Sequence, residues 1–165
     1  MHPELASRFE ALEQRRARFT ERVRALSPEK QTAHVEKKEF SPLEVLQHMA
    51  LAEQFDVELM RKRPPEQLKG RRAKTNFIYR NAIGKMEAGK RLPTMGAMLP
   101  KTQLNANEAD QEWQSVRANI RQFLEKADSP DAPVMKSILG TLSAADLLRL
   151  FEAHMKYHEM RFPNV

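Results

Sequence analysis

The chain has 165 residues, 41% of them hydrophobic, and a formal net charge of +6, which predicts a single domain over residues 1–165 that can bury its own core. It has no cysteine, which excludes disulfides, thiolate metal sites and a cysteine nucleophile, so any metal must be held by nitrogen and oxygen. No segment approaches the roughly 20 apolar residues of a membrane span and no secretory signal opens the chain, so we expect a cytoplasmic protein with no membrane partner.

Four segments repeat apolar residues at spacings of three and four, which is the pattern of amphipathic helices. In chain order they cover about residues 3–26, 42–62, 108–126 and 147–162. The candidate N-caps are Ser41 for the second helix, Asn107 for the third and Ser143 for the fourth. A shorter helix is predicted around residues 73–87, and no stretch alternates regularly enough to predict a strand.

The long segments predict an all-α four-helix bundle, and the connections between them predict its topology. About 15 residues join the first two helices and about 16 join the last two, whereas roughly 45 separate the second from the third. A helix of about 20 residues is roughly 30 Å long, so a connection that returns to the starting end must be long. We therefore expect up-down-down-up topology with a long crossover at about residues 63–107.

The crossover region is strongly basic. Residues 61–101 contain twelve Lys and Arg against two Glu, a net charge of +10 that leaves −4 for the rest of the chain. Such a segment could attract an anionic ligand, an acidic partner or nucleic acid, or it could be a solvated connection, which we favour for most of these residues. Only Phe77 and Tyr79 interleave with the charges as aromatic residues, so nucleic acid is not an expected partner.

Three of the five histidines lie on predicted helix faces that point into the bundle. His154 and His158 fall at the centre of the last helix's apolar arc, and His48 lies at the rim of the second helix's arc. Buried imidazoles must hydrogen-bond or bind an ion, because an unsatisfied polar group there costs roughly 1–3 kcal/mol. The i, i+4 spacing stacks two rings where one metal ion can accept both. We therefore predict a metal site that gathers all three, with hydrogen bonds to carboxylates of neighbouring helices as the alternative.

A site of three neutral imidazoles would leave the full charge of a divalent ion uncompensated. Open coordination positions would then accept water, hydroxide or an exogenous thiolate. Zinc or nickel would suit such ligands first, with iron, copper or manganese as alternatives. The sequence assigns no catalytic residue and no residue that binds an organic cofactor.

Other polar residues near these helix faces are expected to be structural. Glu53 lies on the apolar seam of the second helix, about 140° from His48 at the ideal helical repeat, so it should not share the ion. We expect it to form a buried ion pair with an arginine, Arg16 being the candidate, in preference to acting as a catalytic base. Glu44 is expected to cap the second helix, with a hydrogen bond that orients His48 as the alternative, and Tyr157 is expected to pack beside the histidines, with proton donation near the metal as the alternative.

Two segments resemble the DinB-like superfamily of bacterial metal-binding four-helix bundles. They are FSPLEVLQHM at residues 40–49 and HMKYH at residues 154–158. Members begin the second helix with an aromatic residue, a Ser and a Glu before the first histidine, and carry two more histidines at i, i+4 on the last helix. The run ILGTLSA at residues 138–144 resembles the lead-in of one uncharacterised branch. Phe40 stands where Trp is common, and Met49 where Leu is common.

This resemblance implies that His48, His154 and His158 bind a divalent metal ion, on an up-down-down-up bundle that forms a homodimer. The best understood relatives are transferases that use low-molecular-weight thiols such as bacillithiol or mycothiol, so an exogenous thiol and a small-molecule substrate are implied partners. The crossover matches no family motif, and we expect it to determine the substrate pocket.

Two functional classes remain open at this stage. One is a metal-dependent thiol transferase or hydrolase. The other is a non-catalytic helical interaction protein that uses the basic crossover to bind an acidic partner or nucleic acid.

Overall fold

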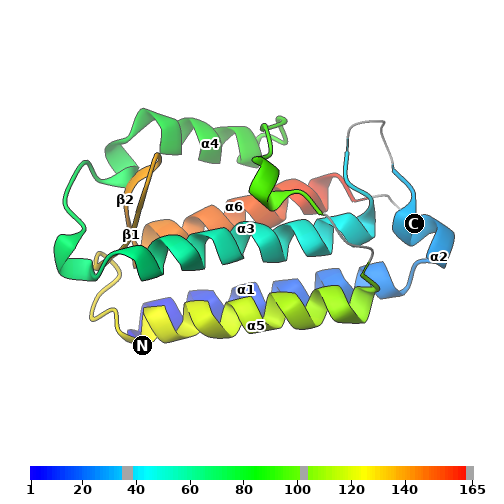
Figure 1. The fold of residues 1–165 in the computed structure, drawn as a ribbon, viewed down its shortest axis with the longest axis horizontal. Coiled ribbons are helices and arrows are strands. Elements are labelled where there is room, and N and C mark those ends of the chain that lie inside the picture. The colour runs from blue at the N-terminus through cyan, green and yellow to red at the C-terminus, as the bar shows by residue number, and fades with distance from the viewer. Residues whose placement is uncertain (35–38, 101–103, 163–165) are drawn as a thin grey trace.

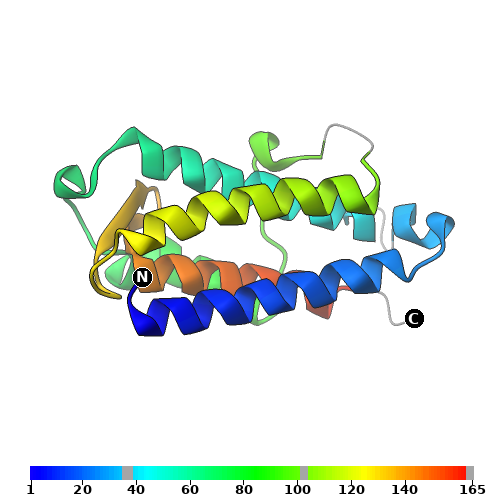
Figure 2. The same ribbon diagram turned by 90° about the horizontal axis from the view of Figure 1, so that it is seen from below.

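The computed structural model describes residues 1–34, 39–100 and 104–162, and most of them are helical. The long helices pack side by side, and Figures 1 and 2 show the first and last of them running from left to right and the two between them from right to left. The mainly helical class predicted from the sequence is confirmed. The four helices are α1 (Pro3–Arg24), α3 (Pro42–Lys62), α5 (Ala106–Glu125) and α6 (Ala144–Met160).

The helix starts follow local capping chemistry. Ser41 caps α3 and Ser143 caps α6, each in a capping box with the acid three residues on, as predicted. The predicted cap of α5 was wrong, because the helix begins after Asn105 and not after Asn107. The Asn105 side chain accepts hydrogen bonds from two backbone N–H groups, and the Glu108 carboxylate accepts one from the Asn105 backbone N–H at 2.9 Å. Both asparagines have an acid three residues later, but the Asp110 carboxylate that follows Asn107 is ion-paired with Arg16 and Arg24 of α1, whereas Glu108 is free to close the capping box with Asn105.

The long connection between α3 and α5 folds back over the bundle. It contains α4 (Phe77–Glu87), close to the predicted short helix, and Figure 1 shows α4 lying above α6. The hydroxyl of Tyr79 donates to the backbone carbonyl of Asp146 at 2.8 Å, which fixes α4 to the first turn of α6. Short helical turns complete the connections: α2 (Pro28–Thr32), η1 (Pro65–Gln67), η2 (Ala73–Thr75) and η3 (Gly96–Met98).

A small β-hairpin precedes α6, where no strand was predicted. Strands β1 (Pro133–Ser137) and β2 (Gly140–Ser143) pair in antiparallel fashion, with an irregular register between Pro133 and Met135. The buried positions in each strand are adjacent and do not alternate, so the sequence lacks the two-residue period that reveals strands. The backbone N–H of Thr141 donates to the carbonyl of Arg71 at 2.9 Å, which docks the crossover on the hairpin.

Gly140 is required where the hairpin meets the crossover. Its φ of +103° is in the region that favours glycine, and an added Cβ would lie 2.8 Å from the Arg71 carbonyl oxygen. We expect Gly140→Ala to lower the free energy of unfolding by about 1–3 kcal/mol in a denaturant titration. Gly84→Ala is the matched control, because nothing lies within 4 Å of its Cβ position on α4. The free energy of unfolding of this control should rise by about 0.5–1 kcal/mol. Equal effects of the two variants would show that Gly140 is not required for its backbone conformation or close packing.

The core lies between the four long helices and continues under the hairpin. A single cluster of buried apolar side chains joins all of these elements. Its largest members include Phe9, Leu12, Leu46, Met49, Trp113, Ile120, Leu124, Met135 and Phe151. Among the residues that the structure describes, none of the helices combines the length and apolarity needed to span a membrane.

Candidate metal centre

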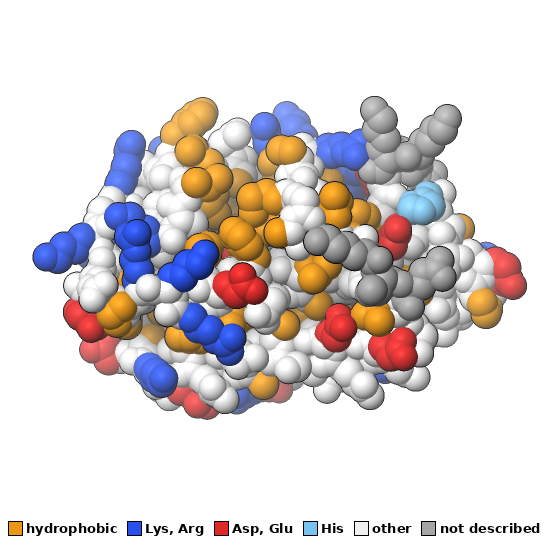
Figure 3. Space-filling view, viewed as in Figure 1, with side chains coloured by type: hydrophobic (Ala, Val, Ile, Leu, Met, Phe, Trp, Pro, Cys, Tyr) orange, Lys and Arg blue, Asp and Glu red, His pale blue; other side chains and the backbone are white. Residues whose placement is uncertain are grey.

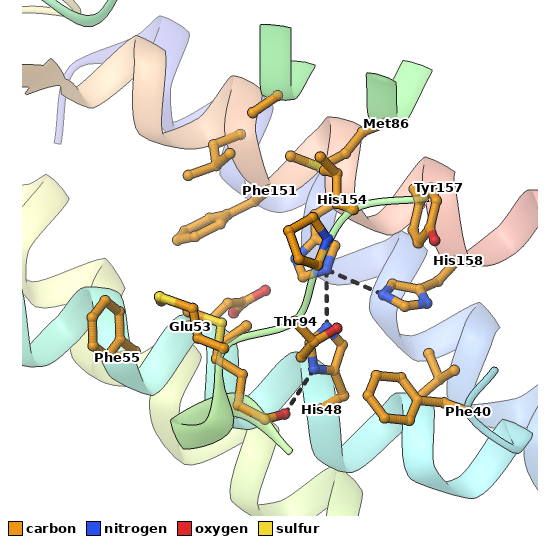
Figure 4. Close-up of a pocket in the computed structure, with 18 of the residues that line it drawn as sticks. Phe40, His48, Glu53, Phe55, Met86, Thr94, Phe151, His154, Tyr157 and His158 are labelled. Carbon is orange, nitrogen blue, oxygen red and sulfur yellow. Dashed lines mark hydrogen bonds between the residues drawn. The ribbon is translucent and has the colours of Figure 1, made fainter. Parts of the chain in front are cut away.

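The structure brings together the three histidines that the sequence singled out. His48 comes from α3, and His154 and His158 come from consecutive turns of α6. Their candidate ligand atoms all lie within 4.8 Å of one another. The Nε2 atom of His154 is 3.2 Å from Nε2 of His48 and 3.1 Å from Nε2 of His158, and Figure 4 shows the three rings converging.

Hydrogen bonding fixes the tautomer of His48. Its Nδ1 lies 2.8 Å from the backbone carbonyl oxygen of Met98. A carbonyl can only accept, so Nδ1 carries the proton and Nε2 of the neutral ring presents a lone pair. That lone pair points at Nε2 of His154, which has one proton at most and two Nε2 neighbours. One proton cannot satisfy both contacts, whereas a cation among the three nitrogens would satisfy them all.

Burial keeps these imidazoles in the form that can bind a metal. It is the main cause that lowers the pKa of all three below the ordinary 6.5, and neighbouring rings add to the effect at His154 and His158; together the two causes lower the pKa of His154 to about 3. The Met98 carbonyl opposes the shift at His48. Among the described residues, no carboxylate hydrogen-bonds to any of the three rings, so the alternative of structural carboxylate partners finds no support.

Aromatic and charged side chains surround the histidines. The Phe40 ring lies 4.8 Å from the ring of His48, centroid to centroid, and the Tyr157 ring lies 4.9 Å from that of His158. The Arg161 guanidinium stacks 4.6 Å from the Tyr157 ring and is ion-paired with Glu39. Tyr157 therefore packs against the cluster, as expected, and burial raises the pKa of its hydroxyl.

A cavity of about 770 Å³ opens beside the three rings. Figure 3 shows apolar side chains exposed in the middle of this face, with Lys and Arg gathered mainly toward its left and upper edges. Residues of α3 and α6 form two sides of the cavity, and the turn of the hairpin closes one end. The crossover supplies a large part of the remaining wall, including Ile78, Ala82, Met86, Leu92, Met95 and Leu99.

Residues 11–159 match the sequence model of the DinB superfamily. The chain belongs to the DinB superfamily. No curated protein and no solved structure matches it. The match covers most of the chain, including α3 and α6, whose segments suggested this family.

The basic crossover of this DinB protein is mostly solvated. Within the described part of the chain, every Lys and Arg between residues 61 and 100 is exposed except the half-buried Lys85. Some reach partners on other elements: Arg61 donates to Asn119 Oδ1 at 2.9 Å, and the Lys74 ammonium lies 3.5 Å from the Asp131 carboxylate. The exposure agrees with the interpretation of the segment as a solvated connection.

Glu53 forms the expected buried ion pair, but with a different arginine. Its carboxylate accepts two hydrogen bonds from Arg117 of α5, at 2.5 and 2.7 Å, and both side chains are 1% exposed. Arg16, the predicted partner, pairs instead with Asp110. Burial raises the pKa of Glu53, and Arg117 opposes that shift. The position of Glu53 among the apolar residues of α3 predicted that it is buried. That position could not predict which arginine of a neighbouring helix contacts it.

Asp56 is a residue of the cavity wall that the sequence analysis did not single out. It makes no hydrogen bond or ion pair with any residue that the structure describes, and burial raises its pKa to about 8, with the charge of Glu53 as a second cause. The signal in the sequence was its position eight residues after His48, which places both on one face of α3.

Proposed function

We propose that this DinB protein binds one divalent metal ion through His48, His154 and His158, on a four-helix bundle of up-down-down-up topology. The observation that carries the proposal is the convergence of three Nε2 atoms with too few protons to satisfy one another. Neutral imidazoles favour zinc or nickel, with iron, copper or manganese as alternatives. A bound ion would lower the pKa of water or of a thiol held beside it and so provide a nucleophile.

The surrounding residues support a role in small-molecule chemistry. The Met98 carbonyl orients His48, Phe40 and Tyr157 flank the rings, and the cavity offers room for a substrate next to them. We propose a metal-dependent thiol transferase or hydrolase that acts in the cytoplasm. By resemblance to better understood relatives, the co-substrate would be an exogenous low-molecular-weight thiol and the active form a homodimer. The adjoining cavity favours this class over a non-catalytic interaction protein.

Metal content of the purified protein tests the proposal directly. We expect about one equivalent of divalent metal in the wild type by elemental analysis, and a loss of at least about tenfold in metal affinity in His154→Ala, because His154 is the central member of the cluster. His34→Ala is the matched control, since His34 is exposed and outside the cluster, and it should bind metal as the wild type does. Equal metal content in His154→Ala and wild type would refute the site.

A further inference from the structure

One face of α3 connects the histidine cluster to the opposite end of the cavity. His48, Ala52 and Asp56 follow one another at intervals of four residues, and all three line the cavity. Eight residues of α-helix span about 12 Å. Between the two polar groups α3 contributes Ala52, Phe55 and Glu53 to the wall, and the charge of Glu53 is matched by the buried Arg117. The cavity thus has a histidine end and an Asp56 end, separated by a length that suits an extended molecule.

Within residues 1–34, 39–100 and 104–162, no cationic side chain pairs with the carboxyl group of Asp56. Among the described residues it has neither a hydrogen-bond partner nor an ion-pair partner. The charge that acts on it is that of Glu53, which is itself matched by Arg117 through two hydrogen bonds. A partly buried carboxylate without a partner is unfavourable, so the site is suited to a group that brings a positive charge.

The cationic side chains that line the cavity are at the histidine end. Arg161 stacks on Tyr157, which itself contacts His158, and Arg161 is ion-paired with Glu39. Arg91 acts electrostatically on the same tyrosine. The lining contains no other Lys or Arg from the described residues. The charge pattern of the cavity is therefore polarised, with its positive groups near the histidines and its one unpaired acid at the far end.

We propose that Asp56 binds the amine group of an elongated cationic ligand. The apolar body of that ligand lies along Ala52 and Phe55, and its other end reaches the histidine cluster. Exposed apolar side chains at the rim give an apolar molecule a route in: Ile78, Met95, Leu99 and Ile138. The assignment of the reacting end rests on the proposed metal site, whereas the amine subsite itself depends only on Asp56 and the cavity.

Matched probes test the subsite without knowledge of the natural ligand. Calorimetric titration of the wild type with n-octylamine and with 1-octanol, at about pH 8.5 where Asp56 ionises and an alkylamine remains cationic, should show about tenfold tighter binding of the amine. In Asp56→Asn the two affinities should become equal. Glu58→Gln is the control, because it removes one acid from the exposed face of the same helix, outside the cavity. The Glu58→Gln variant should still bind n-octylamine about tenfold more tightly than 1-octanol.

Three outcomes would overturn the proposal. Equal affinity of the wild type for amine and alcohol would do so without reference to any variant. An unchanged preference in Asp56→Asn would show that the amine binds elsewhere. Loss of the preference in His48→Ala would show that the amine binds at the histidine cluster. The metal proposal fails independently of this one. If the wild type contained no metal by elemental analysis, its preference for the amine would still be expected.

Discussion

Replacing Arg117 with alanine is expected to lower the free energy of unfolding by about 3–5 kcal/mol, because it leaves the Glu53 carboxylate buried without its partner. Both side chains are 1% exposed, and the guanidinium donates to both carboxylate oxygens. Arg117 also lies over the rings of Trp113 and Phe151, so its removal opens a gap in the packing of the core. Denaturant unfolding followed by circular dichroism measures the loss.

The pH dependence of this loss separates charge from packing. Burial already raises the pKa of Glu53, and without Arg117 that pKa should rise further. A raised carboxyl pKa makes the folded state bind more protons, so the variant should lose stability as the pH rises and recover part of it toward about pH 4. A loss from packing alone would be the same at every pH.

Arg121→Ala is the matched control for Arg117→Ala. Arg121 lies one turn further along α5 and pairs with Glu10 at 3.5 Å, with both side chains about half exposed. Solvent screens that pair, so its removal should cost less than about 1 kcal/mol. If both alanine variants lost the same stability, the buried pair would not have the structural role argued for it.

The contrast between these two arginines also shows how far the sequence could predict the fold. The period of the apolar residues located α1, α3, α5 and α6 because each helix buries one continuous stripe. Period alone does not say how two helices are rotated and offset against each other. Glu53 was therefore recognised as buried, but its partner was predicted on α1, as Arg16. The partner in the structure is Arg117 of α5.

The histidine cluster was predictable for a related reason. His154 and His158 lie four residues apart on one helix, so their proximity follows from helix geometry alone. His48 was added from its position on the inner face of another helix and from the family resemblance, and the structure places it 3.2 Å from His154. The Met98 contact could not be predicted, because it depends on how the crossover folds back.

The cavity was the least predictable part of the site. The length and basic charge of the crossover showed only that it must return along the bundle. Its apolar residues Ile78, Met86 and Leu99 face the cavity because α4 docks on α6 and η3 docks on α3. The hairpin was itself missed, since its irregular register removes the alternation that marks a strand. A pocket built from such long-range contacts leaves no local signal in the sequence.

Asp56→Asn is expected to make the protein more stable above neutral pH. Burial raises the pKa of Asp56 from its ordinary 3.8 to about 8. Between these two values the folded state binds a proton that the unfolded chain has released, so this carboxyl makes the protein progressively less stable as the pH rises from 3.8 to about 8. Each pKa unit corresponds to about 1.4 kcal/mol. Because the carboxyl is only partly buried and reaches the cavity, we expect a smaller total of about 2–4 kcal/mol.

The measurement is the difference in unfolding free energy between Asp56→Asn and wild type across that pH range. All other titrating groups, the three histidines included, are common to both proteins and cancel in the difference. The difference should be near zero at about pH 4, grow through neutral pH and level off above about pH 8. Glu58 lies on the exposed face of the same helix, so the difference in unfolding free energy between Glu58→Gln and wild type should not change across this pH range. A flat difference for Asp56→Asn would mean that water already solvates the carboxylate, and the cavity would then hold no unmet charge to attract a cation.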